Sequence, residues 1–475
     1  MAASAKRIDI VNGPMIPNIL RFSLPLIATG MLQLLYNAAD NIVVGQFDGQ
    51  TALAAVGSTG SLINLILNIC FGLSVGSSVA VAQDYGAGNK DGVHQTIHTS
   101  VLISMLGGIL VGLVGFIFSG TFLQWMGSPE NVLPLSTLYL KIYFLGTPAS
   151  MVYNFCASIL RAVGDTKRPL YFLTISGLIN VILNLFFVIV FHMGVAGVAL
   201  ATIISQYVSM IMVLVYMCRL EDCCRLDFRK LKIYGNKLKK IVQVGLPAGL
   251  QGSVFSISNV LIQSSINSFG SVVMSGNTAA GQLEGFVYTA MNALYQAALT
   301  FTGQNVGAGK VHKLHRVMLS CAAIVICIGL IVGIGMYLLS DVLLEIYLPV
   351  ENAPATEEAM QSNLDNLKAI AYGKTRLLYV MLPYFLCGIM EVMVGCQRGM
   401  GMSMTPMITS MLGACGFRVF WIYTFFTWYR SLPMLYISYP ISWFITTAVH
   451  TINYFRAHKK IKKLYLESHP EEKTV

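Results

Sequence analysis

Long apolar runs, separated by short charged or Gly/Pro-rich stretches, follow one another from Pro14 almost to the end of the chain. Crossing the hydrocarbon core of a bilayer takes a helix of about 20 apolar residues, and these runs have that length. The pattern predicts an all-α polytopic membrane protein with twelve transmembrane helices. The predicted spans are 15–40, 53–83, 94–119, 132–158, 169–191, 195–218, 239–268, 277–305, 315–339, 372–397, 406–428 and 433–455.

Composition supports this interpretation and excludes other classes of protein. Of 475 residues, 55% are hydrophobic and 11% are charged, against roughly 25% charged in an average soluble domain. The mean hydropathy is +0.67. So few charged residues could not cover the outside of a soluble core of this size. A soluble enzyme, a disordered chain and a fibre are therefore excluded.

The net charge of +10 predicts topology rather than a nucleic-acid partner. All but six of the 31 Lys and Arg residues fall in the termini or in alternate loops, on one side of the predicted membrane. The positive-inside rule makes that side cytoplasmic. We therefore expect a multi-pass protein of the inner or plasma membrane with both termini in the cytoplasm. The six exceptions are Lys141, Lys368, Lys374, Arg376, Arg418 and Arg430.

An internal duplication organises the chain. The segments Leu24-Pro25, Gln83–Lys90 and Arg161–Pro169 recur as Leu246-Pro247, Gln304–Lys310 and Arg398–Pro406. Six spans separate the copies, so both halves have the same orientation. They should be related by a pseudo-two-fold axis along the membrane normal, as in parallel-repeat transporters.

The duplication also sets the predicted domains. These are an N-terminal lobe at 1–218, a cytoplasmic linker at 219–238, a C-terminal lobe at 239–457 and a cytoplasmic tail at 458–475. An acidic external insertion at about 340–370 lengthens the second lobe. Two similar lobes with a substrate path between them favour transport by alternating access.

Several other classes of site have no support in the sequence. The ten cysteines contain no C-x-x-C pair and are interpreted as reduced thiols, three of them (Cys218, Cys223 and Cys224) around one basic loop. His94 and His98 have a metal-compatible spacing but no adjacent acidic ligand, so we expect a solvated helix end. No Walker motif or catalytic signature is present. We therefore expect neither an enzyme nor ATP as fuel.

Three carboxylates, Asp40, Glu284 and Glu391, fall inside predicted spans. Ionisable groups are costly in a membrane, which makes each a functional hypothesis. Asp40 shares a helix face with three polar residues, Gln33, Tyr36 and Asn37. Asp40 could exchange protons or, ionised, ligate sodium with neighbouring oxygens. The alternative is a helix end near the outer surface, where Asp40 is merely solvated or capping.

The other two carboxylates have weaker patterns. Glu284 is followed on its face by Tyr288, Met291 and Tyr295, which could form an acidic aromatic wall for a lipophilic cation. Equally, Glu284 could bind a neighbouring backbone or side chain. For Glu391 we favour a structural ion pair, with Arg418 a better partner than Arg398 because two helical turns separate Glu391 from Arg398.

The segment Asp40-Asn-Ile-Val-Val-Gly45, the doubled Gln…Gly-Ala-Gly helix ends and the Arg161–Pro169 loop resemble the multidrug and toxic compound extrusion (MATE) family, with its DinF-like bacterial branch nearest. The resemblance covers nearly the whole chain. It implies secondary antiport, in which organic cations leave the cell while protons or sodium ions enter. No cofactor is implied, and we expect a monomer.

The resemblance also implies a cation-coupling site in the N-terminal lobe. Asp40 matches the family's coupling aspartate. Asn180 and Asn184 match positions that join it, and Gln33 and Thr202 match other polar members. This chain has Asn184 where the family often has aspartate, so the site holds one carboxylate rather than two.

We expect the substrate to contact the following residues: Tyr36, Asn37, Glu284, Tyr288 and Met291. Two alternatives remain. A lipid-linked-oligosaccharide flippase would favour a basic cleft, against which Asp40 and Glu284 argue, with Arg418 the main exception. An integral membrane enzyme would need a catalytic constellation. The coupling ion, the substrate range and the roles of Glu284 and Glu391 stay open.

Overall fold

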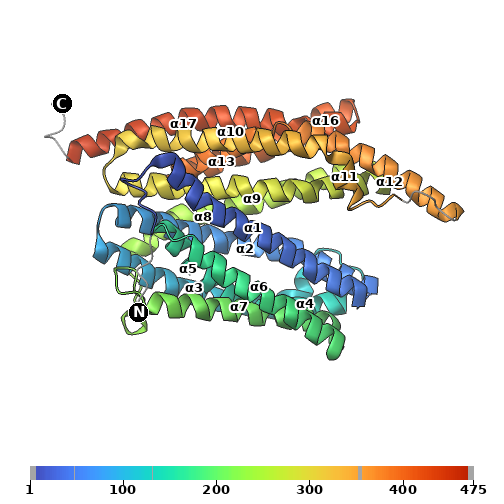
Figure 1. Ribbon diagram of the computed structural model, residues 1–475, viewed down its shortest axis with the longest axis horizontal. Helices are drawn as coiled ribbons and strands as arrows, with labels where there is room; N and C mark the ends of the chain where they lie inside the picture. The colour runs from blue at the N-terminus through green and yellow to red at the C-terminus, as the bar shows by residue number, and fades with distance from the viewer. Residues whose placement is uncertain (1–6, 48, 131, 351–355, 469–475) are drawn as a thin grey trace. The chain divides into compact units, whose positions relative to one another are not determined.

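The computed structural model describes residues 7–47, 49–130, 132–350 and 356–468. Every regular element in this part of the chain is helical, which confirms the all-α prediction (Figure 1). The chain divides into two compact units, each of which is described separately below.

Unit 1 comprises Met1–Ser253 and Gly303–Lys310. Within it α3 packs against α4 and α5, and α6 packs against α1 and α7. Its elements are α1 (Met15–Phe47), α2 (Gly49–Gly86), α3 (Lys90–Trp125), α4 (Leu133–Leu145), α5 (Thr147–Ala162), α6 (Lys167–Leu185), the π-helical turn η1 (Phe186–Val190), α7 (Gly194–Cys218), the 3₁₀ turn η2 (Phe228–Lys230) and the first part of α8 (Gly235–Asn267).

Unit 2 comprises Val254–Thr302 and Val311–Val475. Within it α13 packs against α10 and α17. Besides the end of α8, its elements are α9 (Ser271–Gly307, whose last turn belongs to unit 1), η3 (Val311–Lys313), α10 (Leu314–Leu338), α11 (Ser340–Glu345), α12 (Glu357–Arg376), η4 (Leu377–Met381), α13 (Tyr384–Gly399), α14 (Met404–Ser410), η5 (Met411–Gly416), α15 (Phe417–Trp421), η6 (Ile422–Phe426), α16 (Leu432–Tyr436) and α17 (Ser438–Ser468).

Each of the twelve predicted spans coincides with a helix or with consecutive helical segments. Nine described helices are long and apolar enough to cross a membrane, and α12–η4 with α13, bent by 43° at the break, would make a tenth. The predicted span 132–158 is interrupted at Gly146, which separates α4 from α5. The span 277–305 lies in α9, where polar residues such as Asn277 and Glu284 reduce the apolar character.

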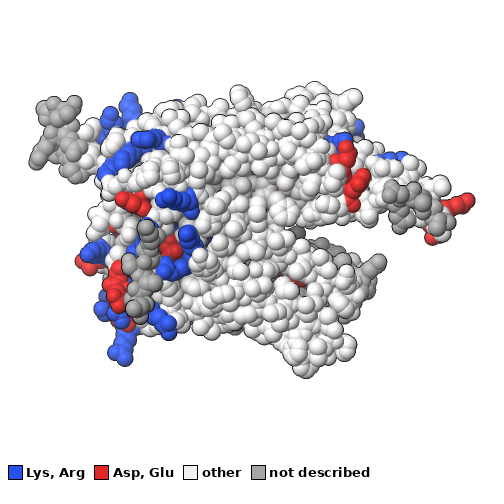
Figure 2. Space-filling view, viewed as in Figure 1, with Lys and Arg blue, Asp and Glu red and all other residues white. Residues whose placement is uncertain are grey.

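Exposed apolar side chains show which surfaces suit lipid. Along α3, Leu106, Leu110, Leu113 and Ile117 form an exposed stripe, with 53–65% of each residue accessible. A contiguous apolar surface of this kind is rare on a soluble monomer. Lys and Arg instead gather at helix ends, and the flanks of the helices are nearly free of charge on the face that Figure 2 shows.

The duplication is visible in the backbone. Each Gly-Ala-Gly helix end turns through a glycine with positive φ: Gly88 at 68° and Gly309 at 71°. The second duplicated loop does the same, with Gly164 at 89° and Gly401 at 86°. Side chains with a Cβ rarely adopt this conformation. The two copies therefore end their helices by the same local geometry.

The compact units do not divide the chain at the predicted linker 219–238. The first half of α8 and residues 303–310 both belong to unit 1. The predicted lobes rest on the duplication and stay a prediction. Residues 351–355 of the predicted external insertion and residues 469–475 of the predicted tail lie outside the described residues.

Close packing between backbones explains why the first part of α8 belongs to unit 1. A Cβ on Gly72 would lie 2.4 Å from the Cα of Gly249, and one on Gly76 would lie 2.1 Å from the carbonyl oxygen of Ile241. A Cβ on Gly245 would in turn lie 2.6 Å from the Cα of Leu73. Both helices thus use a small-x-x-x-small pattern to bring their backbones together.

The ends of α2 and α9 meet in a second close contact, and here the residues are repeat partners. A Cβ on Gly86 would lie 2.0 Å from the carbonyl oxygen of Gln304, and one on Gly307 would lie 1.9 Å from that of Gln83. Gln83 and Gly86 correspond to Gln304 and Gly307 in the duplication. Each copy therefore offers its glycine to the same carbonyl of the other.

We predict that Gly76→Ala lowers the thermal midpoint of the detergent-solubilised protein. Its new methyl group would overlap the backbone of α8, and overpacking of this kind costs about 1–3 kcal/mol. Gly57→Ala on the same helix is the control, because a Cβ there meets nothing within 4 Å. Equal midpoints for the two variants, measured by heating followed by size-exclusion chromatography, would contradict the packing argument.

Candidate functional site

Asp40 of α1 faces Asn184 of α6 within unit 1. The Asn184 amide nitrogen donates a hydrogen bond to Asp40 Oδ1. Asn184 is fully buried, and Asp40 is half-buried. The expectation that these two residues share one site is met by their geometry. The alternative of Asp40 as a solvated helix end does not fit this contact.

The contact continues into a chain of polar side chains. Asn184 Nδ2 also lies 3.3 Å from Asn180 Oδ1, and Asn180 Nδ2 lies 3.5 Å from Thr202 Oγ1 of α7. Thr202 donates its own hydroxyl to the carbonyl of Val198 at 2.9 Å. One helical turn separates Asn180 from Asn184, which places both amides on one face. Three helices therefore meet at a single hydrogen-bonded row.

The electrostatics of this row are unusual for the interior of a membrane protein. Among the described residues, Asp40 has no ion-pair partner, and Asn184 supplies its hydrogen bond. The Asn184 Oδ1 is buried and has no hydrogen-bond partner in the described part of the chain. Buried polar atoms are usually satisfied, so this acceptor needs an explanation. It lies on the side chain that also binds the carboxylate.

Local backbone geometry accompanies the site. The π-helical turn η1 begins at Phe186, two residues after Asn184. Wide turns of this kind are rare and occur frequently at functional sites. Asn184 thus lies beside an irregular point of its helix.

The other predicted residues of α1 have different surroundings. A Cβ on Gly177 of α6 would overlap the ring of Tyr36, whose hydroxyl donates to the carbonyl of Thr174 at 3.3 Å. Tyr36 therefore packs α1 on α6. Gln33 and Asn37 are exposed, and neither joins the hydrogen-bonded row.

Unit 2 holds a second carboxylate, which is paired with an arginine. Glu284 Oε2 of α9 lies 2.5 Å from an Nη of Arg376, the last residue of α12. The other Nη of Arg376 donates to Asn277 Oδ1 at 2.5 Å, and Tyr436 donates its hydroxyl to the same oxygen at 3.2 Å. Both charged side chains are mostly buried, 11% exposed for Arg376 and 19% for Glu284. Glu284 is thus bound to a neighbouring side chain, one of the two predicted alternatives.

The predicted acidic aromatic wall beyond Glu284 is not formed within unit 2. Tyr288 is exposed, but Met291 is fully buried, where it lies against Gly388 of α13. Tyr295 is also buried and accepts a hydrogen bond from Arg398 at 2.6 Å. The reason is that α9 packs closely on α13, so that Met291 and Tyr295 lie between the two helices.

The predicted partner of Glu391 is wrong. Arg418 donates through Nε to Ser442 Oγ at 2.9 Å, and its guanidinium lies 4.2 Å from the ring centre of Tyr439. Aromatic rings, rather than a carboxylate, therefore surround the charge of Arg418.

The expectation of a solvated helix end is wrong for His98, because this residue is fully buried. Its Nε2 accepts from the backbone N–H of Asp227 at 3.1 Å, which ties α3 to the loop after α7.

Sequence reasoning missed Arg376, Asn277 and Tyr436 as a group. In the sequence, Arg376 is one of the exceptions to the positive-inside pattern and follows the acidic insertion. A signal was available on α9, since Asn277 and Glu284 are seven residues apart and share one face. Nothing in the sequence indicates that α12 and α16 bring Arg376 and Tyr436 to that face.

The chain matches known proteins along most of its length. The family model named MatE matches residues 25–186 and 247–424. Among curated proteins, the probable multidrug resistance protein YoeA of Bacillus subtilis is 27% identical over 406 residues, 84% of each chain. The probable multidrug resistance protein YpnP of the same organism is 31% identical, over 64% of this chain and 68% of its own.

Solved structures match the fold. One described as the outward-facing conformation of a multidrug resistance MATE family transporter has a TM-score of 0.86. It is 22% identical in sequence, and the match covers 96% of this chain and 99% of that one. At this identity the likeness shows the fold alone.

We predict that Glu284→Gln lowers the thermal midpoint more than the double variant Glu284→Gln/Arg376→Met does. The single change leaves a buried guanidinium without its counter-charge, and breaking a buried pair costs roughly 3–5 kcal/mol, whereas replacing both partners is often neutral. The midpoints of wild type, both single variants and the double variant form a complete cycle. Additive effects in that cycle would mean that the pair contributes no coupling.

Proposed function

Because the chain belongs to the MatE family, whose members are membrane transporters, we propose that it is a secondary antiporter that exports organic cations in exchange for protons or sodium ions. Family membership confirms the prediction of a transporter rather than an enzyme. The names of the two Bacillus relatives support multidrug export. Coupling to an ion is the further step, and it is argued from the Asp40 site.

The bond between Asn184 and Asp40 carries the proposal of coupling. An ionised carboxylate only accepts hydrogen bonds, so it takes the N–H₂ end of the Asn184 amide. A protonated carboxyl gains an O–H donor, and the unpartnered Asn184 Oδ1 is an acceptor beside it. Binding or release of one proton would therefore reverse the direction of hydrogen bonding between α1 and α6.

Sodium is the other candidate ion, and the same residues could serve it. The Asp40 carboxylate, the amide oxygens of Asn180 and Asn184 and the hydroxyl of Thr202 are oxygen ligands within one row. Rotating the Asn184 amide would present its oxygen and remove its donor from the carboxylate. Either ion would change the contact between α1 and α6.

Export follows if ion and substrate disfavour each other's binding. By thermodynamic reciprocity, an ion that weakens substrate binding is itself weakened by the substrate to the same degree. An ion gradient across the membrane then drives release of the substrate on the outside. The wide turn η1 beside Asn184 is the point at which α6 would accommodate the change.

The proposed contacts to substrate are the exposed residues of the predicted set, Asn37 and Tyr288, together with the half-buried Tyr36. Glu284 could attract a cation only in competition with Arg376, which lies 2.5 Å away. Met291 is buried in unit 2 and is not proposed as a contact. A flippase for lipid-linked oligosaccharides is not favoured, because it would need a basic cleft, whereas the spans hold the carboxylates Asp40 and Glu284, with the buried Arg418 as the main exception.

We further propose a location in the inner or plasma membrane, with both termini in the cytoplasm, and action as a monomer. The distribution of basic residues supports this orientation through the positive-inside rule.

We predict that Asp40→Asn abolishes uphill efflux of ethidium from everted vesicles while the protein still inserts and folds. The amide side chain has the size of the carboxyl but neither binds nor releases a proton. Glu358→Gln, an exposed carboxylate of α12, is the matched control and should leave efflux unchanged. Undiminished efflux by Asp40→Asn, at equal protein levels, would refute coupling at this site.

The two coupling ions are separated in proteoliposomes by Thr202→Val. If sodium is the coupling ion, loss of a hydroxyl ligand should raise the sodium concentration for half-maximal efflux several-fold. If the proton is used, efflux driven by an imposed pH gradient should be unaffected, because the hydrogen bond that changes with protonation of Asp40 comes from Asn184 and not from Thr202. Imposing each gradient separately on wild type and variant decides between these outcomes.

A further inference from the structure

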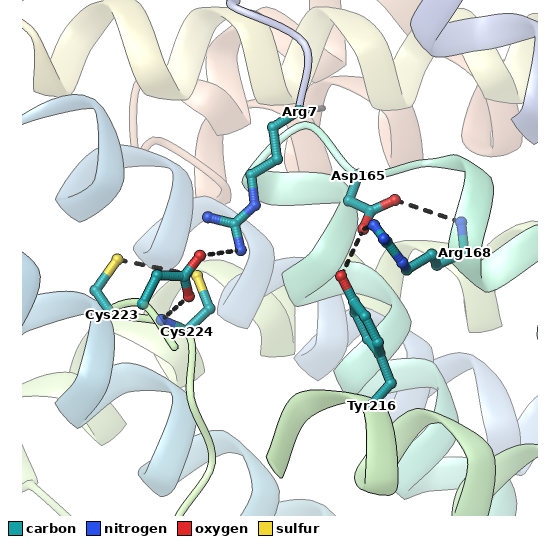
Figure 3. Close-up of polar contacts among 7 residues, drawn as sticks. Arg7, Asp165, Arg168, Tyr216, Cys223 and Cys224 are labelled. Carbon is teal, nitrogen blue, oxygen red and sulfur yellow. Dashed lines mark hydrogen bonds and ion pairs between the residues drawn. The ribbon is translucent and has the colours of Figure 1, made fainter. Parts of the chain in front are cut away.

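The turn after α7 carries two adjacent cysteines beside an ion pair. The side-chain ligand atoms of Asp222, Cys223 and Cys224 lie within 4.8 Å of one another, and the two sulfurs are 4.0 Å apart. These residues lie outside the helices that could span a membrane. Figure 3 shows Arg7 of the N-terminal segment reaching toward the two cysteines.

Arg7 and Asp222 hold this turn in place. An Nη of Arg7 lies 2.6 Å from Asp222 Oδ2, and the Arg7 side chain is 14% exposed. The other oxygen of Asp222 accepts the backbone N–H of Cys224 at 2.8 Å. The guanidinium therefore stabilises the turn and brings positive charge close to the thiols.

The two thiols differ in exposure and in acidity. Cys224 is fully buried against the core of unit 1, whereas Cys223 is half-buried. The hydrogen bond between the two thiols, with help from Arg7, lowers the pKa of Cys223 to about 7. The thiolate is the nucleophilic form of cysteine. Cys223 is thus the accessible nucleophile, and Cys224 is a second thiol in reach.

A metal ion fits this cluster poorly. It offers three ligand atoms, and one of its carboxylate oxygens is already bound to Arg7. A structural zinc site needs four ligands, and a guanidinium beside the ligands opposes any cation. A bond between the two sulfurs needs neither a fourth ligand nor a bound cation.

We propose that Cys223 and Cys224 are a modification site at which hydrogen peroxide forms a reversible disulfide. The Cys223 thiolate attacks one peroxide oxygen and becomes a sulfenic acid, while the other oxygen leaves as hydroxide and takes up a proton. The Cys224 sulfur then attacks the Cys223 sulfur, forming the S–S bond. The sulfenic hydroxyl leaves as a second water with the Cys224 proton. The two thiols are oxidised by two electrons, and the peroxide is reduced to two waters.

The disulfide would be easy to reduce. Adjacent Cα atoms are about 3.8 Å apart, whereas the Cα atoms of disulfide-bonded cysteines are usually about 4.4–6.8 Å apart. Strained disulfides are the labile and regulatory ones. A cellular thiol would therefore restore the pair.

Oxidation would also change the anchoring of the N-terminal segment that carries Arg7. It removes the thiolate and draws the sulfurs together in the turn that holds Asp222, and Asp222 anchors Arg7. Two further contacts hold this segment: Ile8 N–H donates to the carbonyl of Gly164 at 3.3 Å, and Lys310 donates to Asn12. The inference is independent of the proposed transport function.

The test uses the full chain in membrane vesicles, treated with hydrogen peroxide, blocked with a maleimide and analysed as peptides by mass spectrometry. We expect the peptide with Cys223 and Cys224 to carry no maleimide and to be about 2 Da lighter than the reduced, unlabelled peptide. After reduction it should bind two maleimides. In Cys224→Ser, dimedone should trap a sulfenic acid on Cys223.

Two variants sharpen this test. Cys218→Ser, the neighbouring half-buried cysteine, should leave the reaction unchanged. Arg7→Met should slow it several-fold, because the thiolate loses its nearby positive charge. Peroxide that leaves both thiols open to maleimide, a disulfide that requires Cys218, or sulfinic acid on Cys223 without a disulfide would each overturn the proposal.

Discussion

A polar group in a lipid environment must find its partner inside the protein, and this constraint accounts for most of the structure described here. Backbone groups meet it by forming helices. Side chains meet it by joining helices to one another, as Asn184 of α6 joins Asp40 of α1 and Arg376 of α12 joins Glu284 of α9. Glycines add contacts in which backbones touch, as between α2 and α8, which the ion pair of Asp84 with Lys237 also joins. Polar bonds and close backbone contacts thus both stabilise the helix packing within each unit.

Two of the three carboxylates in the predicted spans, Asp40 and Glu284, differ in the kind of partner they have. An amide remains a good neighbour whether the carboxyl is charged or neutral, since it offers both a donor and an acceptor. An arginine offers donors only, so neutralising Glu284 would leave Arg376 as an uncompensated charge. The surroundings of Asp40 therefore suit either charge state, as the proposed coupling requires, whereas those of Glu284 suit its ionised form.

Sequence reasoning succeeded where the relevant information is local. Helix positions, the duplication and the shared face of Asn180 and Asn184 follow from spacing along the chain. The pairing of Glu284 with Arg376 joins residues 92 positions apart, and the burial of His98 depends on a loop 129 positions away. Distances of that kind are set by packing. The π-helical turns η1, η4, η5 and η6 were missed because no spacing or punctuation in their sequences distinguishes them from regular helix.

The reciprocal contact between the ends of α2 and α9 has the form of an interface between two identical subunits. Each copy gives a glycine and receives a carbonyl, as self-complementary two-fold interfaces do. A protein made of one repeat would already carry both halves of that interface and could assemble as a homodimer through it. Fusion of two such genes would preserve the contact without any new complementary surface, after which the copies could acquire different residues.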